Sequence, residues 1–230
     1  MAGSLSLPAP CKTAHMHFSD PRAAAIFAEY DTRHKAERNL MRDLPTGQFG
    51  ERRDEFLLPV GAEVGNFLRA LAIARAPERI LELGTSYGYS TLFLADAARA
   101  CGAKVVTVDV DAAKQNYAHG MLERAGLADH VEFRCGDALD VVAADEGEFG
   151  LVLLDIWKNL YLPCFEAVYP KLAEEGVIVS DNMITPESAR EAVRAYREAV
   201  RARPDLQTVL LPLGSGIELT IKWSAGNSKL

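Results

Sequence analysis

Strand-like and helical segments alternate along most of this 230-residue chain, and this alternation limits the fold more than any other feature. Short runs rich in Leu and β-branched residues have the character of buried strands, and segments with helical periodicity follow them. Such an alternation predicts a parallel sheet with helices on both faces. The predicted strands are Arg79–Leu83, Lys104–Asp109, Val131–Cys135, Leu151–Asp155 and Val177–Ser180, and the predicted helices that follow them are 88–101, 112–126, 137–144, 160–173 and 187–203.

The two ends of the chain depart from this alternation. Near the C-terminus, Thr208–Leu213 and Ile217–Trp223 flank Gly214-Ser-Gly216, and a short glycine turn between two strands predicts an antiparallel hairpin. Two helices, over about 20–42 and 61–74, are expected before the first strand. We therefore predict an α/β fold with a doubly wound sheet of seven strands, mostly parallel with a C-terminal antiparallel hairpin, and an N-terminal helical extension.

The same pattern defines the domain organisation. Since no low-complexity linker interrupts it, we expect one domain over residues 21–223, in which 21–58 form the helical extension or lid. Residues 1–20 are expected to be a flexible arm and residues 224–230 a tail.

Composition excludes several classes of protein. The net charge of −7 and the pI near 5.3 argue against a surface that binds nucleic acid. The four cysteines form no C-x-x-C pair, which suits a reducing cytoplasm. No apolar run is long enough to span a membrane, and the first residues lack the pattern of a signal peptide.

Polar side chains close two of the predicted strands. Asp155 ends one strand and Lys158 follows it, while Asp181 and Asn182 come directly after another. Ligands of open α/β sheets bind beyond the carboxyl ends of the strands, so these side chains are expected to meet there. Carboxylate and amide oxygens suit Mg²⁺ or Ca²⁺ better than zinc. A metal beside an amine that can act as a base predicts an enzyme.

A glycine-rich loop follows the first strand, in Glu82-Leu-Gly84-Thr-Ser-Tyr-Gly88. Glycines allow a tight turn close to a ligand, and an acid at the end of the next strand, here Asp109, commonly binds ribose hydroxyls. Together they predict a nucleoside cofactor. Glu82 favours a cationic sulfonium cofactor over a pyrophosphate by charge attraction, so S-adenosylmethionine fits better than NAD.

At this level of detail the chain resembles the cation-dependent O-methyltransferases, the class that contains catechol O-methyltransferase and the caffeoyl-CoA O-methyltransferases. The matching motifs occur in the order of that family and cover about residues 55–223. They are Val60-Gly61-x-x-x-Gly65, Leu81-Glu82-Leu-Gly84-x-x-x-Gly88-Tyr89-Ser90, Asp109, Gly136-x-Ala138, Asp155-x-Trp157-Lys158-x-x-Tyr161, Asp181-Asn182 and Gly216-Ile-Glu-Leu.

The resemblance implies a Rossmann-like domain, a role for each matching residue, and a homodimer. Val60, Glu82, Gly84, Ser86 and Ser90 would bind the methionine and ribose end of the cofactor, Asp109 the ribose hydroxyls, and Ala138 and Trp157 the adenine. Asp155, Asp181 and Asn182 would hold Mg²⁺ or another divalent cation such as Mn²⁺ or Ca²⁺, with Asp155 also serving the cofactor. Lys158 would be the catalytic base.

The acceptor stays open at this stage. We expect a small molecule with vicinal oxygens, an ortho-diphenol such as a catechol, flavonoid or hydroxycinnamate. Ile156 stands where animal catechol enzymes carry His, and Val209 where they place a glutamate, which puts catechol itself in doubt. The alternatives are a hydroxylated uridine in tRNA, with Arg38, Arg42, Arg52 and Arg53 as a basic patch, a non-catalytic nucleoside-binding protein, and an NAD oxidoreductase.

Overall fold

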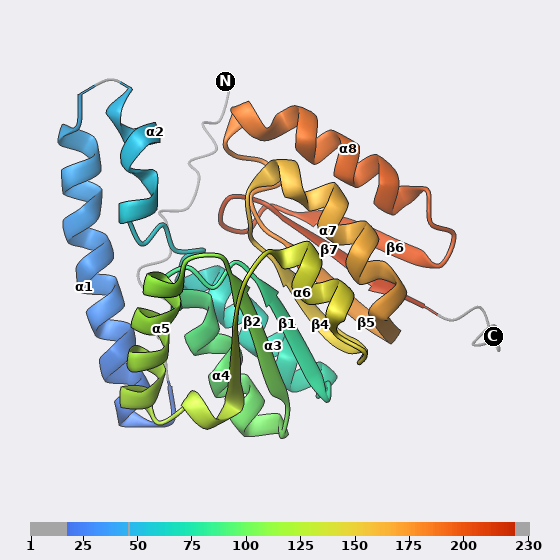
Figure 1. Cartoon of the computed structure of the whole chain (residues 1–230), viewed down its shortest axis with the longest axis horizontal. Coiled ribbons are helices and arrows are strands. Elements are labelled where there is room, and N and C mark those ends of the chain that lie inside the picture. Colours follow the sequence, from blue (N-terminus) through green and yellow to red (C-terminus); the bar gives the residue numbers. More distant parts are fainter. Residues whose placement is uncertain (1–17, 46, 224–230) are drawn as a thin grey trace, which may run out of the picture.

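The computed structural model describes residues 18–45 and 47–223, where a central sheet separates two layers of helices (Figure 1). The seven strands lie in the order β3-β2-β1-β4-β5-β7-β6, and all pairs are parallel except those that β7 makes. The strands are β1 Arg79–Leu83, β2 Lys104–Asp109, β3 Val131–Cys135, β4 Phe149–Leu154, β5 Leu172–Ser180, β6 Leu206–Leu211 and β7 Ile217–Lys222. The predicted fold class is therefore confirmed.

Helices cover both faces of the sheet because its strands bury side chains on both. Along β1, Ile80 packs into one core with α3, α4 and α5, whereas Leu81 and Leu83 pack into the other with α6, α7 and α8. The helices are α1 Pro21–Asp43, α2 Gln48–Arg52, α3 Ala62–Arg75, α4 Tyr89–Cys101, α5 Ala112–Ala125, α6 Ala138–Ala144, α7 Tyr161–Val168 and α8 Arg190–Arg201. No helix in the described ranges is long and apolar enough to cross a membrane.

Two local predictions need correction. The helix expected over 160–173 ends at Val168, because a 3-10 turn with Pro170 in its first positions follows, and β5 begins at Leu172. Two further elements, α2 and the 3-10 turn Arg53–Glu55 after it, were not predicted. The predicted tail and most of the predicted arm lie outside the described residues.

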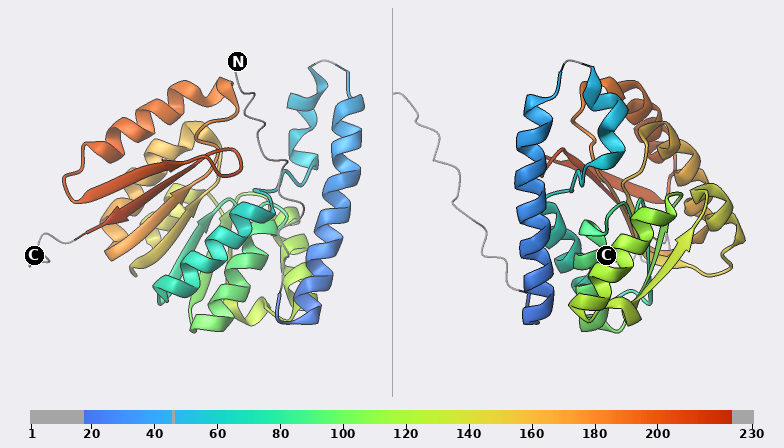
Figure 2. Two further views of the ribbon diagram at one scale, coloured as in Figure 1. Left: turned by 180° about the vertical axis from the view of Figure 1, so that it is seen from behind. Right: turned by 60° about the vertical axis from the view of Figure 1, so that its left-hand side comes forward.

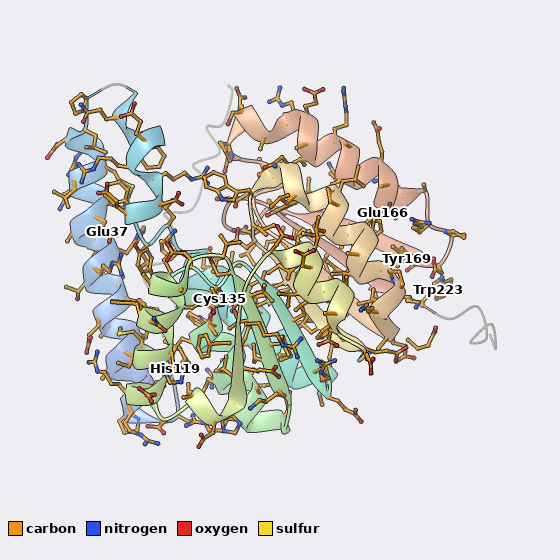
Figure 3. All side chains as sticks on the ribbon, in the orientation of Figure 1. Glu37, His119, Cys135, Glu166, Tyr169 and Trp223 are labelled. Atoms are coloured by element: carbon orange, nitrogen blue, oxygen red, sulfur yellow. The ribbon has the colours of Figure 1, made fainter. Side chains whose placement is uncertain are left out.

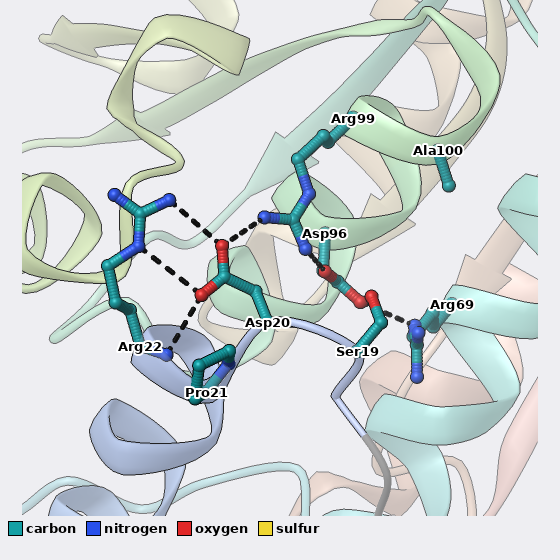
Figure 4. Close-up of a pocket in the computed structure, with 8 residues that line it drawn as sticks. All are labelled: Ser19, Asp20, Pro21, Arg22, Arg69, Asp96, Arg99 and Ala100. Carbon is teal, nitrogen blue, oxygen red and sulfur yellow. Dashed lines mark hydrogen bonds and ion pairs between the residues drawn. The ribbon is translucent and has the colours of Figure 1, made fainter.

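An ionic cluster fastens the start of α1 to the body of the domain (Figure 4). Asp20 caps α1 by accepting a hydrogen bond from the backbone amide of Arg22, and it also binds the Arg99 side chain of α4 at 2.8 Å. Asp96, almost fully buried, pairs with Arg99 and with Arg69 of α3. Opposite charges thus join three helices at one end of α1.

The other end of α1 supports a shorter segment, which consists of α2 and the turn after it (Figure 2). From here on the name lid is used for this segment alone, residues 48–57. Glu37 lies on α1 beside the end of the lid (Figure 3), and its buried carboxylate accepts hydrogen bonds from the Leu57 amide at 2.7 Å and from Arg33 at 2.6 Å. The Arg33 guanidinium lies 3.9 Å from the centre of the Tyr87 ring. The lid is therefore tied to the glycine loop through α1.

Candidate active site

A cavity of about 700 Å³ opens where the carboxyl ends of β1, β2, β4 and β5 meet the lid. It lies at the point of the sheet where the strand order reverses, between β1 and β4. Crossover connections leave these two neighbouring strands in opposite directions, so the loops after them separate and leave a crevice.

The glycine loop touches the end of β4 inside this crevice. Gly84 has a φ of +105°, and a Cβ placed there would lie 2.0 Å from the carbonyl oxygen of Asp155. The amide of Asp155 in turn donates to the carbonyl of Leu83 at 3.0 Å. Only glycine permits both this conformation and this approach. Gly84 thus sets the position of Asp155 relative to the loop.

The loop also orders the strand-end acid of β2. The carboxylate of Asp109 accepts hydrogen bonds from the amide of Ser86 at 2.7 Å and from the amide of Asp111 at 3.0 Å. It lines the cavity together with Ser86, Ser90 and, from the first turn of α6, Ala138. Two backbone donors hold the acid in place and leave its remaining acceptor positions for a ligand.

Glu82 lies beneath the cavity and does not line it. Its carboxylate is fully buried and accepts hydrogen bonds from Ser90 at 2.5 Å, Thr91 at 2.6 Å and Thr107 at 2.6 Å. Burial raises the pKa of Glu82 to about 7, against the effect of the three hydroxyl donors. Glu82 therefore reaches the cavity only indirectly, through its hydrogen bond with Ser90, which lines the cavity.

The opposite wall of the cavity carries the carboxylates of Asp155 and Asp181. Asp181 is 2% exposed, and its Oδ1 has no hydrogen-bond partner among residues 18–45 and 47–223. Burial raises the pKa of Asp181 well above its usual range, and the charge of Asp155 acts in the same direction. Asn182, in the left-handed region at φ 55°, lines the same wall. A buried carboxylate oxygen without a donor, beside a second carboxylate, fits a cation.

Lys158 is held beside these carboxylates. Its Nζ lies 3.4 Å from Asp155 Oδ1, donates to the carbonyl of Ile156 at 3.0 Å, and donates to the hydroxyl of Tyr161, which donates onward to the Asp181 carbonyl at 3.1 Å. Burial lowers the pKa of Lys158, although the two aspartates oppose this. The amine is therefore positioned and easier to deprotonate than an exposed lysine.

The cavity brings together almost every residue that the sequence analysis selected. Besides Lys158, Asp181 and Asn182, the selected residues that line it are Val60, Gly84, Ser86, Ser90, Asp109, Ala138, Asp155 and Trp157. Ile156 also lines it, whereas Val209 does not. Among the described residues, no three His, Cys, Asp or Glu side chains form a metal-binding group, and the predicted set has only two such residues with an amide.

On the side of the cavity that the lid forms, Arg53 was the one residue named from the sequence, and it was named for another role, as part of a basic patch for tRNA. This side contains His34 of α1 together with Phe49, Arg53, Asp54 and Phe56. These residues belong to no motif, and no pattern in the sequence indicated that they would line the cavity. Their place in the site depends on how α1 holds the lid over the sheet.

A doubly wound sheet with a glycine loop, a strand-end acid and a buried lysine in one crevice is typical of an α/β enzyme that uses a nucleoside cofactor. The O-methyltransferase family model matches residues 35–223, and the chain belongs to this family. It is an S-adenosylmethionine-dependent O-methyltransferase, so the predictions of S-adenosylmethionine as cofactor and of the reaction class are confirmed, while the divalent cation stays a prediction.

Individual relatives agree with this family. Catechol O-methyltransferase of Niastella koreensis is 34% identical over 170 residues, which cover 68% of this chain and 76% of the relative. Caffeoyl-CoA O-methyltransferase 1 of Arabidopsis thaliana is 31% identical over 186 residues, 71% of each chain. An O-methyltransferase of Streptomyces achromogenes involved in tomaymycin synthesis, solved in complex with SAM, is similar with a TM-score of 0.69 and 26% identity, over 86% of this chain and 90% of that one.

The contact between Gly84 and Asp155 leads to a first prediction. Gly84→Ala should weaken binding of S-adenosylhomocysteine about tenfold to a hundredfold, because the added methyl group must displace the Asp155 carbonyl. Isothermal titration calorimetry measures this. Gly102→Ala is the matched control, since Gly102 also has a positive φ of +80° but its added methyl group would meet no described residue within 4 Å apart from its neighbours in the chain. Equal losses of affinity in both variants would contradict the prediction.

Burial of Glu82 leads to a second prediction, on stability and pH. The folded-state pKa of about 7 exceeds the value of 4.5 for an unperturbed glutamate, so the unfolded chain loses this proton first. The contribution of Glu82 to stability should therefore be greatest below pH about 4.5 and fall by about 3 kcal/mol as the pH rises to about 7. Urea unfolding across this pH range should show that the free energy of unfolding falls more for the wild type than for Glu82→Gln. If the free energies of both proteins change with pH in the same way, the raised pKa is not that of Glu82.

Proposed function

We propose that this enzyme transfers the methyl group of S-adenosylmethionine to a hydroxyl of a small ortho-diphenol, with the help of a divalent cation such as Mg²⁺. The observation that carries the proposal is the buried Oδ1 of Asp181, which finds no hydrogen-bond partner in the part of the chain that the structure describes and lies on the wall that also carries Asp155. A catechol O-methyltransferase and a caffeoyl-CoA O-methyltransferase among the relatives support this acceptor class.

Asp155, Asp181 and Asn182 would hold the cation. Their two carboxylates and one amide are hard oxygen ligands, which suit Mg²⁺, Mn²⁺ or Ca²⁺. When bound, the cation would favour the ionised form of the acceptor hydroxyl. The positive charge would also compensate the burial of Asp181, whose Oδ1 receives no hydrogen bond from the described residues.

Lys158 would receive the proton of the acceptor hydroxyl on Nζ. A phenol has a pKa near 10 and is mostly neutral at pH 7, so its oxygen needs a base before it can attack the methyl group. Burial lowers the pKa of Lys158 and thereby favours the neutral amine that can accept a proton. Tyr161, whose hydroxyl joins Nζ to the Asp181 carbonyl, would orient this amine.

The remaining residues would bind the cofactor. We assign Val60, Gly84, Ser86 and Ser90 to its methionine and ribose end, and Glu82 acts there by orienting the Ser90 hydroxyl. The Asp109 carboxylate would accept hydrogen bonds from the ribose, and Asp155 would attract the ammonium group. Ala138 and Trp157 would flank the adenine.

The alternative acceptor, a uridine in tRNA, draws little support from the charges of the lid region. Residues 38–55 contain four arginines but also four carboxylates. Arg42 lies 4.0 Å from Asp43, and Arg52 lies 2.7 Å from Glu55. A balanced surface of this kind does not attract a polyanion strongly. A homodimer and a place in the cytoplasm stay predictions.

The cation is tested by its removal. EDTA should abolish methylation of a catechol, and Mg²⁺ should restore it. Asp181→Asn should need a higher Mg²⁺ concentration and should also lose the Mg²⁺-dependent rise in melting temperature, because one ligand charge is gone. Asp140→Asn, an exposed position outside the cavity, is the control. Full activity of the wild type in EDTA would refute the metal assignment.

The base is tested separately. Lys158→Met should lower kcat about a hundredfold or more, since loss of general-base catalysis typically costs that much. The affinity for S-adenosylhomocysteine should stay within about twofold, because the amine contacts Asp155, Ile156 and Tyr161 and not the glycine loop. Steady-state kinetics and calorimetry measure the two quantities. An unchanged kcat would exclude Lys158 from the mechanism.

A further inference from the structure

Arg53 is the lid cation that faces the cavity, and its surroundings differ from those of the other basic side chains there. Lys114 lies 3.3 Å from Asp54 and Lys158 lies 3.4 Å from Asp155. In contrast, no carboxylate of the described part of the chain lies within ion-pair distance of Arg53, which is only partly exposed. A half-buried guanidinium with no carboxylate beside it keeps its charge and its N–H donors available for an anionic ligand.

The Trp157 ring determines how this guanidinium is presented. The Arg53 guanidinium carbon lies 4.8 Å from the centre of the Trp157 ring, and both residues line the cavity. A guanidinium stacked on an indole uses its face for the aromatic contact and keeps its N–H donors, which lie in its plane, for other partners. Those donors match the two oxygens of a carboxylate.

The position of the pair limits the size of its ligand. Trp157 immediately precedes Lys158, and Arg53 lines the same cavity as the amine that would receive the acceptor proton. An anionic group bound by Arg53 must therefore belong to the acceptor ring or to a short side chain on it. Phosphates at the far end of a long thioester would lie beyond this region.

We propose that Arg53, stacked on Trp157, determines acceptor specificity by binding a carboxylate on the ring or short side chain of the ortho-diphenol. The preferred acceptors would then be dihydroxybenzoic or dihydroxycinnamic acids in their ionised form. This inference rests on the proposed function, because it assumes methylation of an ortho-diphenol at Lys158. To that function the inference adds the chemical nature of the acceptor's third substituent, a carboxylate on the ring or on its short side chain.

The test compares 3,4-dihydroxycinnamate with its methyl ester, which has the same ring and side chain without the charge. Wild type should have a kcat/KM for the acid about tenfold or more above that for the ester, since a charged bidentate contact contributes at least that much. Arg53→Gln should raise KM for the acid about tenfold more than KM for the ester. Arg53→Lys keeps the charge and loses the planar guanidinium, so its preference for the acid over the ester should lie between that of the wild type and that of Arg53→Gln.

Arg52→Gln is the matched control. Arg52 is the preceding residue and carries the same charge, but it pairs with Glu55 and does not line the cavity, so its loss should leave the preference for the acid intact. Calorimetry with S-adenosylhomocysteine checks that each variant keeps a folded cofactor site.

The outcomes separate this inference from the proposed function. Equal use of acid and ester by the wild type, or an equal loss on both with Arg53→Gln, overturns the role of Arg53 and leaves ortho-diphenol methylation standing. If the wild type prefers the CoA thioester to both the acid and the ester, and Arg53→Gln loses this preference, then Arg53 binds phosphate. That result also overturns the role of Arg53 in binding a carboxylate. If neither diphenol is methylated and total tRNA is, the proposed function and this inference both fail.

Discussion

The contact between Gly84 and the Asp155 carbonyl is the constraint on which the rest of the site depends. It joins the loop after β1 to the end of β4 at the place where the strand order reverses. A side chain at position 84 would separate the two loops. Because Asp155 faces both the proposed cofactor region and the proposed cation region, this single close approach brings methyl donor and acceptor chemistry into one crevice.

The cavity has two walls of different character around that contact. The sheet supplies the carboxylates, of which Asp181 is buried without a donor on one oxygen. The lid supplies aromatic rings and Arg53. Since Glu37 holds the lid through the Leu57 amide, the proposed acceptor side of the site depends on α1 as much as on the sheet. The cofactor side depends on short loops whose backbone amides orient Asp109.

Much of the fold followed from patterns in the sequence, because buried parallel strands need continuous apolar runs and those runs are visible without coordinates. The bounds of β1, β2 and β3 were predicted to the residue. The helix over 160–173 was overextended, since its apolar periodicity continues into β5 and hides the break at Pro170. The short helix α2 has too few residues for a periodicity to appear.

The sequence by itself determined which side chains stand at the ends of the strands, since strand and loop alternate in a fixed order and parallel strands end at one edge of the sheet. Asp109, Asp155, Asp181 and Lys158 were therefore found without coordinates. Only the tertiary structure decided that Glu82 is hidden beneath Ser90 and that Arg53 stacks on Trp157. Such contacts join residues far apart in the chain, and they depend on the packing of whole elements rather than on any local pattern.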